Sequence, residues 1–228
     1  MFKASTKWVF SNESFRLRIA ECGLSDLATL SSPSLGEHVT QHETSWVRRW
    51  TDGSSVYYIK TYDYPKWGAR FKGLGRNTFL AESRPQREQR ALKWLADHGV
   101  PIPRVQAVIE SRVLVALAGG FLARGVLVTE AWEGEPLPAL LSILPSDQCT
   151  EVLKYLHTFV TRLHSAGFRD RNMNLRNILA RKKGEDWQFA KIDSPRFRLV
   201  APGPSKDTWA QEDWQRLNQD LAAMHLSF

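Results

Sequence analysis

The sequence predicts an α+β protein of two lobes, a β-rich N-terminal lobe over residues 1–130 and a mainly helical C-terminal lobe over residues 131–228. Three observations support this. β-Branched and aromatic residues are frequent from Trp8 to about Lys60, which favours strands. Residues 146–165 repeat apolar side chains every three or four positions, as an amphipathic helix does. Between them, Gly134–Pro138 interrupts both patterns, so we place the lobe junction close to it.

The N-terminal lobe is expected to contain a hairpin and one long helix. Trp46–Trp50 and Val56–Lys60 alternate in hydrophobicity on either side of a glycine-containing loop, which predicts a β-hairpin. Residues 84–98 carry apolar side chains at helical spacing and run into a glycine and two prolines, so they should form a helix of about four turns. Two short strand-like runs follow, at Arg112–Leu117 and Gly125–Thr129.

The C-terminal lobe is expected to contain two long helices with loops and a strand between them. The helix at 146–165 should end at Gly167, and the loop 170–177 follows directly. Trp187–Ile192 alternates like a strand. Residues 207–226 should form a closing helix, because their tryptophans and leucines fall on one side.

Composition limits the possible function classes. The chain has 31 Lys and Arg against 24 Asp and Glu, a formal charge of +7 that favours anionic partners such as nucleotides, phosphorylated glycans, acidic lipids or nucleic acid. Cys22 and Cys149 lie far apart, so neither a disulfide framework nor a zinc site is expected. No signal peptide is evident, and the longest apolar run, Val113–Ala123, is too short to cross a bilayer. We therefore expect a cytoplasmic protein whose membrane contact, if any, is peripheral.

The most informative segment is 163–198, which contains Asn177 and, after a strand, Asp193. Phosphoryl transfer needs a polar group that orients the attacking hydroxyl, an amide on the loop that follows, and a carboxylate near a strand that holds Mg²⁺ against the nucleotide phosphates. Asn177 and Asp193 have the residue types and the order required of the last two. The segment therefore predicts a kinase-like phosphotransferase that uses ATP and Mg²⁺.

Three residues of the N-terminal lobe fit the same chemistry. A kinase also needs a cation on the nucleotide phosphates and a carboxylate that holds this cation in place. Lys60 ends the predicted aromatic strand, and Glu88 lies on the next predicted helix, from which it can reach back to Lys60. The loop expected to cover the phosphates is a weak match because it has one glycine, Gly53, although the backbone amides of any tight turn can face a phosphate.

These motifs together resemble the lipopolysaccharide-core sugar kinases, bacterial relatives of protein kinases that phosphorylate heptose or 3-deoxy-octulosonic acid. The resemblance covers about residues 56–198. The segments that carry it are Tyr58–Lys60, Arg87–Leu95 leading into Gly99–Pro103, Leu127–Ala131, Leu163–Phe168, Asn174–Leu179 and Ile192–Asp193.

The resemblance implies a two-lobed protein-kinase-like fold with nucleotide bound in the crevice between the lobes. It implies that Lys60 contacts the α- and β-phosphates and that Glu88 orients Lys60. Glu130 and Ala131 would lie at the adenine-binding hinge, and the asparagine and aspartate described above would hold Mg²⁺. The implied acceptor is a hydroxyl of heptose or 3-deoxy-octulosonic acid on the lipopolysaccharide core, or another anionic glycan, at the cytoplasmic face of the inner membrane.

One position departs from the family pattern. The catalytic aspartate of this family stands five residues before the metal-binding asparagine, and Asn172 occupies that position here. An amide accepts a hydrogen bond from the acceptor hydroxyl but cannot take its proton at neutral pH. In a loose transition state, positioning alone retains part of the rate. Asp170 is the alternative: its carboxylate could occupy the site if the loop bulges, or it could pair with Arg171 or Arg176 and only brace the loop.

A stretch between Lys60 and Glu88 interleaves aromatic and basic residues: Tyr62, Tyr64, Lys66, Trp67, Arg70, Phe71, Lys72 and Arg76. This pattern suits binding to the membrane interface, to a phosphorylated sugar or to single-stranded nucleic acid. Alternatively, the aromatic side chains only pack beneath the lobe while the basic ones are exposed. Nucleic acid is not expected, because no recognised nucleic-acid motif accompanies the stretch. A pseudokinase scaffold, favoured by Asn172 and the single glycine, and a kinase of another small molecule stay open as alternatives.

Overall fold

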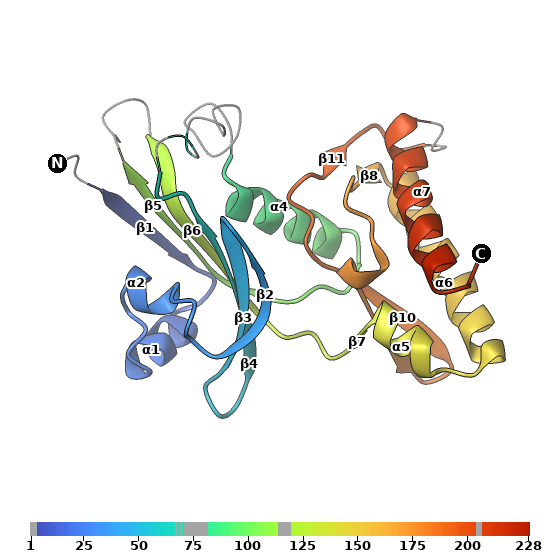
Figure 1. The fold of residues 1–228 in the computed structure, drawn as a ribbon, viewed down its shortest axis with the longest axis horizontal. Helices are drawn as coiled ribbons and strands as arrows, with labels where there is room; N and C mark the ends of the chain where they lie inside the picture. The colour runs from blue at the N-terminus through green and yellow to red at the C-terminus, as the bar shows by residue number, and fades with distance from the viewer. Residues whose placement is uncertain (1–3, 67, 69, 71–81, 114–119, 204–206) are drawn as a thin grey trace. The chain divides into compact units, whose positions relative to one another are not determined.

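The computed structural model describes residues 4–66, 68, 70, 82–113, 120–203 and 207–228 (Figure 1). The chain forms two compact units. The N-terminal unit comprises residues 1–90 and 103–131, and the C-terminal unit comprises residues 91–102 and 132–228. The division falls within helix α4 (Arg84–Asp97), so the second half of this helix belongs to the C-terminal unit.

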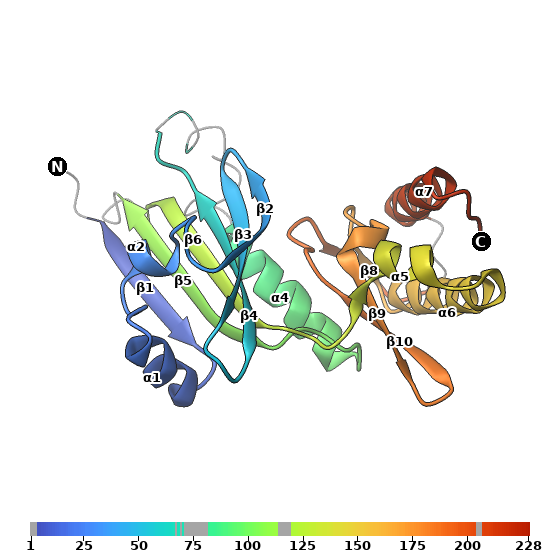
Figure 2. The ribbon, with the colours of Figure 1, turned by 60° about the horizontal axis from the view of Figure 1, so that its bottom comes forward.

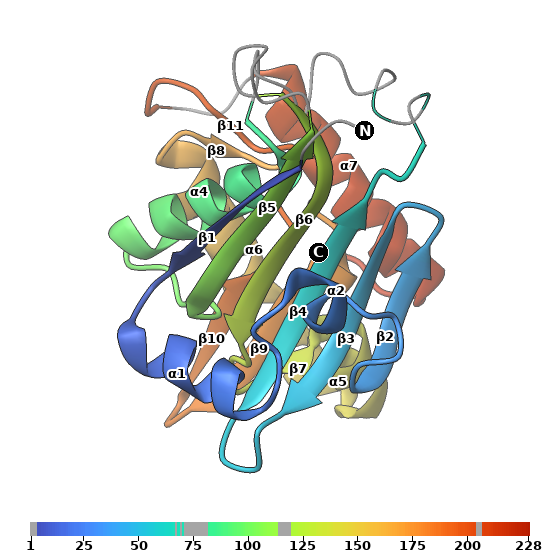
Figure 3. The same cartoon turned by 90° about the vertical axis from the view of Figure 1, so that its left-hand side faces the viewer.

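The N-terminal unit is built on a six-stranded antiparallel sheet with the order β1-β5-β6-β4-β3-β2 (Figure 3). The strands are β1 (Ser5–Phe10), β2 (Glu37–His42), β3 (Ser45–Thr51), β4 (Val56–Asp63), β5 (Val105–Val113) and β6 (Phe121–Glu130). The predicted hairpin is the β3-β4 pair. Of the strand predicted at Arg112–Leu117, Arg112 and Val113 end β5, and residues 114–117 lie outside the described residues. Strand β5 begins earlier, at Val105, because Ala107 and Ile109 enter the core directly after the prolines.

Two short helices interrupt the segment that was predicted to be β-rich. Helices α1 (Glu13–Glu21) and α2 (Leu27–Leu30) each begin at a capping side chain. Asn12 Oδ1 accepts from the Phe15 amide at 2.7 Å, and Asp26 Oδ1 accepts from the Thr29 amide at 2.9 Å. Figure 3 shows both helices on one face of the sheet, where their apolar residues pack in one cluster with residues of β4, β5 and β6.

Helix α4 begins on the opposite face of the sheet, and a glycine permits its close approach. A Cβ atom on Gly125 of β6 would lie 2.8 Å from Pro85 Cγ, closer than real Cβ atoms come to a neighbour. Glu110 of β5 accepts from the Ser83 hydroxyl and from Gln86 Nε2, the latter at 2.9 Å. These contacts fix the first turn of α4 and place Glu88 one turn later.

The C-terminal unit combines helices with two small sheets around one core. Its elements after α4 are β7 (Glu135–Pro136), α5 (Leu137–Ile143), α6 (Ser146–Ser165), β8 (Phe168–Arg169), the 3₁₀ turn η1 (Leu175–Asn177), β9 (Ile178–Lys183), β10 (Asp186–Lys191), β11 (Arg198–Leu199) and α7 (Thr208–Ala223). Helix α6 has the predicted bounds. Helices α6 and α7 lie side by side (Figure 2), and Trp214 stacks on His157 with 4.8 Å between ring centroids.

Part of the aromatic and basic stretch lies outside the described residues, namely Trp67 and residues 71–76. Tyr62 and Tyr64 are buried and pack with Leu122, as the packing alternative predicts for these two rings. The roles proposed for the rest of the stretch stay predictions. Within the described part of the chain, no helix has the length and apolarity that crossing a membrane requires.

Candidate active site

Lys60 and Glu88 form an ion pair in the N-terminal unit. Lys60 Nζ lies 2.8 Å from Glu88 Oε2, and the two side chains are 17% and 7% exposed. The Tyr62 hydroxyl also donates to Glu88 Oε2, at 2.9 Å, a contact that sequence analysis did not predict. The carboxylate therefore holds the ammonium group from α4, while part of the lysine stays accessible. This is the arrangement needed for a lysine that contacts nucleotide phosphates.

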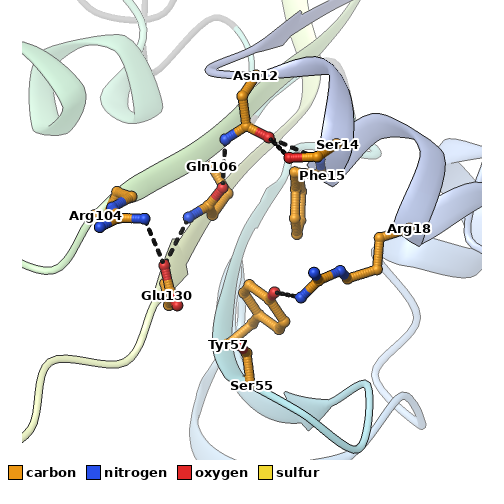
Figure 4. Close-up of a pocket in the computed structure, with 9 residues that line it drawn as sticks. All are labelled: Asn12, Ser14, Phe15, Arg18, Ser55, Tyr57, Arg104, Gln106 and Glu130. Carbon is orange, nitrogen blue, oxygen red and sulfur yellow. Dashed lines mark hydrogen bonds and ion pairs between the residues drawn. The ribbon is translucent and has the colours of Figure 1, made fainter.

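The predicted hinge residues, Glu130 and Ala131, lie at the end of β6, and the sheet uses both of their backbone donors. The Glu130 amide donates to Arg104 O at 2.9 Å, and the Ala131 amide donates to Val56 O at 2.8 Å. The Glu130 carboxylate accepts from Gln106 Nε2 at 2.9 Å and lies in a polar pocket beside α1 (Figure 4). An adenine contact by these two residues would therefore have to use their carbonyl groups, and this role stays a prediction.

Gly53 lies in the hairpin turn between β3 and β4, where side chains of the turn accept from the backbone amides. The Gly53 amide donates to Thr51 Oγ1 at 3.1 Å, and the Ser54 and Ser55 amides donate to Asp52 Oδ1 at 2.9 and 2.7 Å. Burial raises the pKa of Asp52, but these amides and Arg18 outweigh burial and hold that pKa well below its usual range. In this structure the turn amides are thus bonded to side chains of the turn itself, and the phosphate-binding role of Gly53 stays a prediction.

In the C-terminal unit, Asp213 of α7 organises the loop that follows β8. Its side chain is fully buried. Oδ2 accepts from the Asp170 amide at 3.0 Å and lies 3.2 Å from His164 Nε2, while Oδ1 accepts from the Arg171 amide at 2.8 Å. The loop backbone is therefore fixed immediately before Asn172. Sequence analysis missed this residue, although an acid in register with Leu217 on an apolar helix face was a usable signal.

The structure brings Asn172, Asn177 and Asp193 together. Asn172 Nδ2 donates to Asp193 O at 2.8 Å and to Asp193 Oδ2 at 2.9 Å. Asn177 Nδ2 donates to Asn172 O at 3.0 Å, and Asn174 Nδ2 donates to Asn172 Oδ1 at 3.1 Å. Three asparagines and one aspartate thus form a connected network, in which Asn172 is half-buried and borders the carboxylate of Asp193.

Two non-glycine residues of this site adopt the left-handed backbone conformation, Arg171 at φ 57° and Asp193 at φ 55°. Aspartate tolerates this region better than most residues, whereas for arginine it costs roughly 1–2 kcal/mol. Such strain persists where surrounding contacts impose it, and here the Asp213 carboxylate and the Asn172 amide do so. The left-handed conformation of Arg171 turns the loop next to Asn172, and that of Asp193 turns the chain after β10.

The predicted magnesium ligands fit the chemistry of that ion. Mg²⁺ prefers oxygen ligands and is usually bound by one or two carboxylates together with substrate phosphates and water. Asn177 uses its Nδ2 on the backbone oxygen of Asn172, which leaves its Oδ1 end as an acceptor, and Asp193 supplies a carboxylate to the same network. In the described part of the chain, no group of three or more His, Cys, Asp or Glu residues gathers as a metal cage would require. A carboxylate and an amide oxygen are donors that Mg²⁺ accepts together with nucleotide phosphates and water.

Asp170 is not available to an acceptor in this structure. Its side chain has no exposed surface, and its Oδ2 lies 2.8 Å from Nζ of Lys191, which is equally buried. Burial raises the pKa of Asp170 to about 6, against the opposing effect of Lys191. The loop does not bulge as the alternative required, and the bracing partner is Lys191 rather than Arg171 or Arg176. The acceptor-orienting role therefore falls to Asn172 as a proposal.

Replacing Lys191 with methionine is expected to destabilise the protein by about 3–5 kcal/mol, because Asp170 is then left buried without its counter-charge. The double variant Asp170→Leu/Lys191→Met should recover most of this loss, since neither charge remains. Urea denaturation of the wild type and both variants measures the effect. A double variant no more stable than Lys191→Met would contradict the account.

The same pair predicts a pH dependence. The folded-state pKa of Asp170, about 6, lies above the ordinary aspartate pKa of 3.8. The contribution of Asp170 to the free energy of unfolding is therefore greatest below pH 3.8, and it is lost as the pH rises through 6. Between these two pH values, the free energy of unfolding of the wild type should fall by about 3 kcal/mol at most relative to that of Asp170→Leu/Lys191→Met. Equal pH profiles for the two proteins would show that Asp170 does not titrate in this way.

The model of the lipopolysaccharide kinase (Kdo/WaaP) family matches residues 36–227, which include the ion pair and the asparagine–aspartate network. The chain belongs to this family. The matched range begins after α2, so β1, α1 and α2 lie outside it. A sequence search of curated proteins found no match.

Solved structures confirm the fold of this Kdo/WaaP family member. A structure of WaaP in complex with acyl carrier protein is 16% identical, with a TM-score of 0.63 over 94% of this chain and 80% of that one. The Rio2 kinase of Chaetomium thermophilum, in its ADP/Mg²⁺-phosphoaspartate complex, is 18% identical, with a TM-score of 0.55 over 85% of this chain and 57% of that one. The predicted α+β, protein-kinase-like fold class is therefore correct.

Proposed function

We propose that this protein is a kinase that transfers the γ-phosphoryl group of ATP to a sugar hydroxyl of the lipopolysaccharide inner core, heptose or 3-deoxy-octulosonic acid. The observation that supports this proposal most directly is the hydrogen-bonded network of Asn172, Asn177 and Asp193 in a chain of the Kdo/WaaP family. It supplies an amide for the acceptor hydroxyl and two oxygen ligands for a cation. These are the groups on which phosphoryl transfer depends.

ATP and Mg²⁺ are the proposed cofactors. The Rio2 structure, to which this fold is similar, was solved with ADP and Mg²⁺. We assign Lys60 to the nucleotide phosphates, with Glu88 as the residue that orients it, and Asn177 and Asp193 to the cation. When bound, the cation would neutralise charge that develops on the phosphoryl oxygens.

Asn172 is assigned to the acceptor. Its Nδ2 faces the backbone and side-chain oxygens of Asp193, so the amide orientation is fixed by the donors and acceptors around it. The Oδ1 end accepts from Asn174 and has a second lone pair that can accept from a sugar hydroxyl. An amide there orients the nucleophile without removing its proton, which suits a loose transition state and predicts a slower reaction than an aspartate supports.

The acceptor and its location follow from the family and the charge. A net charge of +7 favours an anionic glycan, and the lipopolysaccharide core carries carboxylates and phosphates. We propose that the protein meets this substrate by peripheral contact at the cytoplasmic face of the inner membrane. A pseudokinase scaffold is the second candidate, favoured by Asn172 in place of an aspartate and by the carboxylate-filled turn at Asp52.

Replacing Lys60 with methionine is expected to raise the dissociation constant of Mg²⁺-ATP by about tenfold to a hundredfold, because the ammonium group no longer contacts the phosphates. The fold should remain, since Tyr62 still donates to Glu88. Calorimetric titration with Mg²⁺-ATP measures the change, with Lys154→Met, an exposed lysine of α6, as the control. Wild-type protein that binds no nucleotide would favour the scaffold.

A further inference from the structure

Two arginines gather around Trp209 beside the candidate active site of the C-terminal unit. Arg198 Cζ lies 4.0 Å from the centroid of the Trp209 ring, and Arg171 Cζ lies 6.0 Å from it. Arg171 directly precedes Asn172 in the chain, and Arg198 follows Asp193 by five residues. The cluster of Arg171, Trp209 and Arg198 is thus attached to both segments of the asparagine–aspartate network.

This cluster has an excess of positive charge. Arg171 Nε lies 3.3 Å from Glu212 Oε2, and both of these side chains are 39% exposed. Arg198 is exposed, and no carboxylate of the described residues lies within ion-pair distance of it. The acids close to the cluster in sequence are also engaged: Asp207 by Arg169 at 2.8 Å and Asp170 by Lys191 at 2.8 Å. The guanidinium group of Arg198 therefore has no counter-charge within the described structure.

Stacking on an indole ring prepares a guanidinium group to bind an anion. The ring face holds the plane of the guanidinium group, while the N–H groups at its edge remain directed outward. This planar fork matches a carboxylate or a phosphate, to which it donates two parallel hydrogen bonds. Because the side chain is already held by Trp209, less conformational entropy is lost when the anion binds.

We propose that the cluster of Arg171, Trp209 and Arg198 binds an anionic group of the acceptor glycan, a carboxylate or a phosphate on a sugar near the reacting hydroxyl. The inference rests on the proposed function and specifies how its substrate is recognised. Arg198 supplies the bidentate contact, Trp209 holds Arg198 in place, and Arg171 adds charge next to Asn172. The same cluster would discriminate against neutral sugars, which leave Arg198 without its partner.

Binding of a deacylated inner-core oligosaccharide tests the proposal. Three forms of the oligosaccharide are titrated by calorimetry: the intact form, one with its carboxyl groups reduced and one without phosphate. The proteins are the wild type, Arg198→Gln, Arg198→Lys and Trp209→Leu, with Arg162→Gln, an exposed arginine of α6, as the charge-matched control. Mg²⁺-ATP is titrated separately to show that each variant is folded and binds nucleotide.

We expect Arg198→Gln and Trp209→Leu to raise the dissociation constant of the intact oligosaccharide about tenfold, and Arg198→Lys to raise it less, while Arg162→Gln and nucleotide binding stay unchanged. The wild type should bind no more tightly than Arg198→Gln to the form of the oligosaccharide that lacks the recognised group. This result identifies the group as carboxylate or phosphate.

Three results would overturn the proposal. If the wild type and Arg198→Gln bind the intact oligosaccharide equally well, the cluster has no role in recognition, although the proposed function stands. If the wild type binds both modified forms of the oligosaccharide more tightly than Arg198→Gln does, Arg198 does not bind an anionic group. If the wild type binds no form of the oligosaccharide, the proposed acceptor fails and the inference fails with it.

Discussion

Replacing Asp193 with alanine is expected to reduce phosphoryl transfer by about a thousandfold or more, equivalent to about 4 kcal/mol of transition-state stabilisation. The carboxylate is the one charged oxygen ligand in the asparagine–aspartate network, and it borders Asn172 at 2.9 Å. Its loss removes the charged one of the two proposed cation ligands and a partner of the amide that orients the acceptor. Initial rates with saturating Mg²⁺-ATP measure this effect.

Two further variants make this prediction specific. Asn172→Ala should lower the rate less, by about tenfold to a hundredfold, because positioning is lost but the cation ligand remains. Asp186→Ala, an exposed carboxylate of β10 that contacts only Tyr155 in the described structure, serves as the control and should keep the wild-type rate. Equal activity of Asp193→Ala and Asp186→Ala would remove Asp193 from the proposed site.

Replacing Asp213 with asparagine is expected to destabilise the protein by about 3–5 kcal/mol and to disorder the loop at 170–177. The carboxylate accepts from two backbone amides and contacts His164, all without access to water. An asparagine replaces one of the two acceptor oxygens with an NH₂ group, which cannot accept from these donors. Each buried amide that is left without an acceptor costs about 1–3 kcal/mol. Chemical denaturation monitored by tryptophan fluorescence gives the change in the free energy of unfolding.

The matched control lies two turns further along α7. Asp220 Oδ2 accepts from a single backbone amide, that of Leu175, at 2.8 Å, and its side chain is only half-buried. Asp220→Asn should therefore cost about 1 kcal/mol. A cost for Asp213→Asn no larger than that of Asp220→Asn would show that Asp213 does not organise the loop.

Local patterns predicted those parts of the site that are set by local structure. The helix at 146–165 and the strand that carries Lys60 each bury one face, and periodicity reveals such faces directly. The Lys60–Glu88 pair followed because the order of strand and helix restricts which charges can meet. The types and order of Asn177 and Asp193 likewise predicted that these two residues belong to one site, and Asn172 links them in the structure.

The missed features depend on contacts between distant residues or on single side chains. Asp170 was considered with the arginines close to it in sequence, whereas its partner is Lys191, which β10 supplies. The glycine at position 53 indicated a turn, but not that Asp52 accepts from the amides of Ser54 and Ser55. Helix α1 depends on the cap at Asn12 within a segment whose composition favours strands.

Mass spectrometry of the acceptor after reaction is the most direct test of the proposed function. Wild-type protein is incubated with Mg²⁺-ATP and dephosphorylated lipopolysaccharide inner core, and Asp193→Ala is treated in parallel. The account predicts that the core gains a phosphate on a heptose or 3-deoxy-octulosonic acid with the wild type and does not with Asp193→Ala. An unmodified core with folded, nucleotide-binding wild-type protein would contradict the proposed acceptor, and equal modification by both proteins would contradict the proposed site.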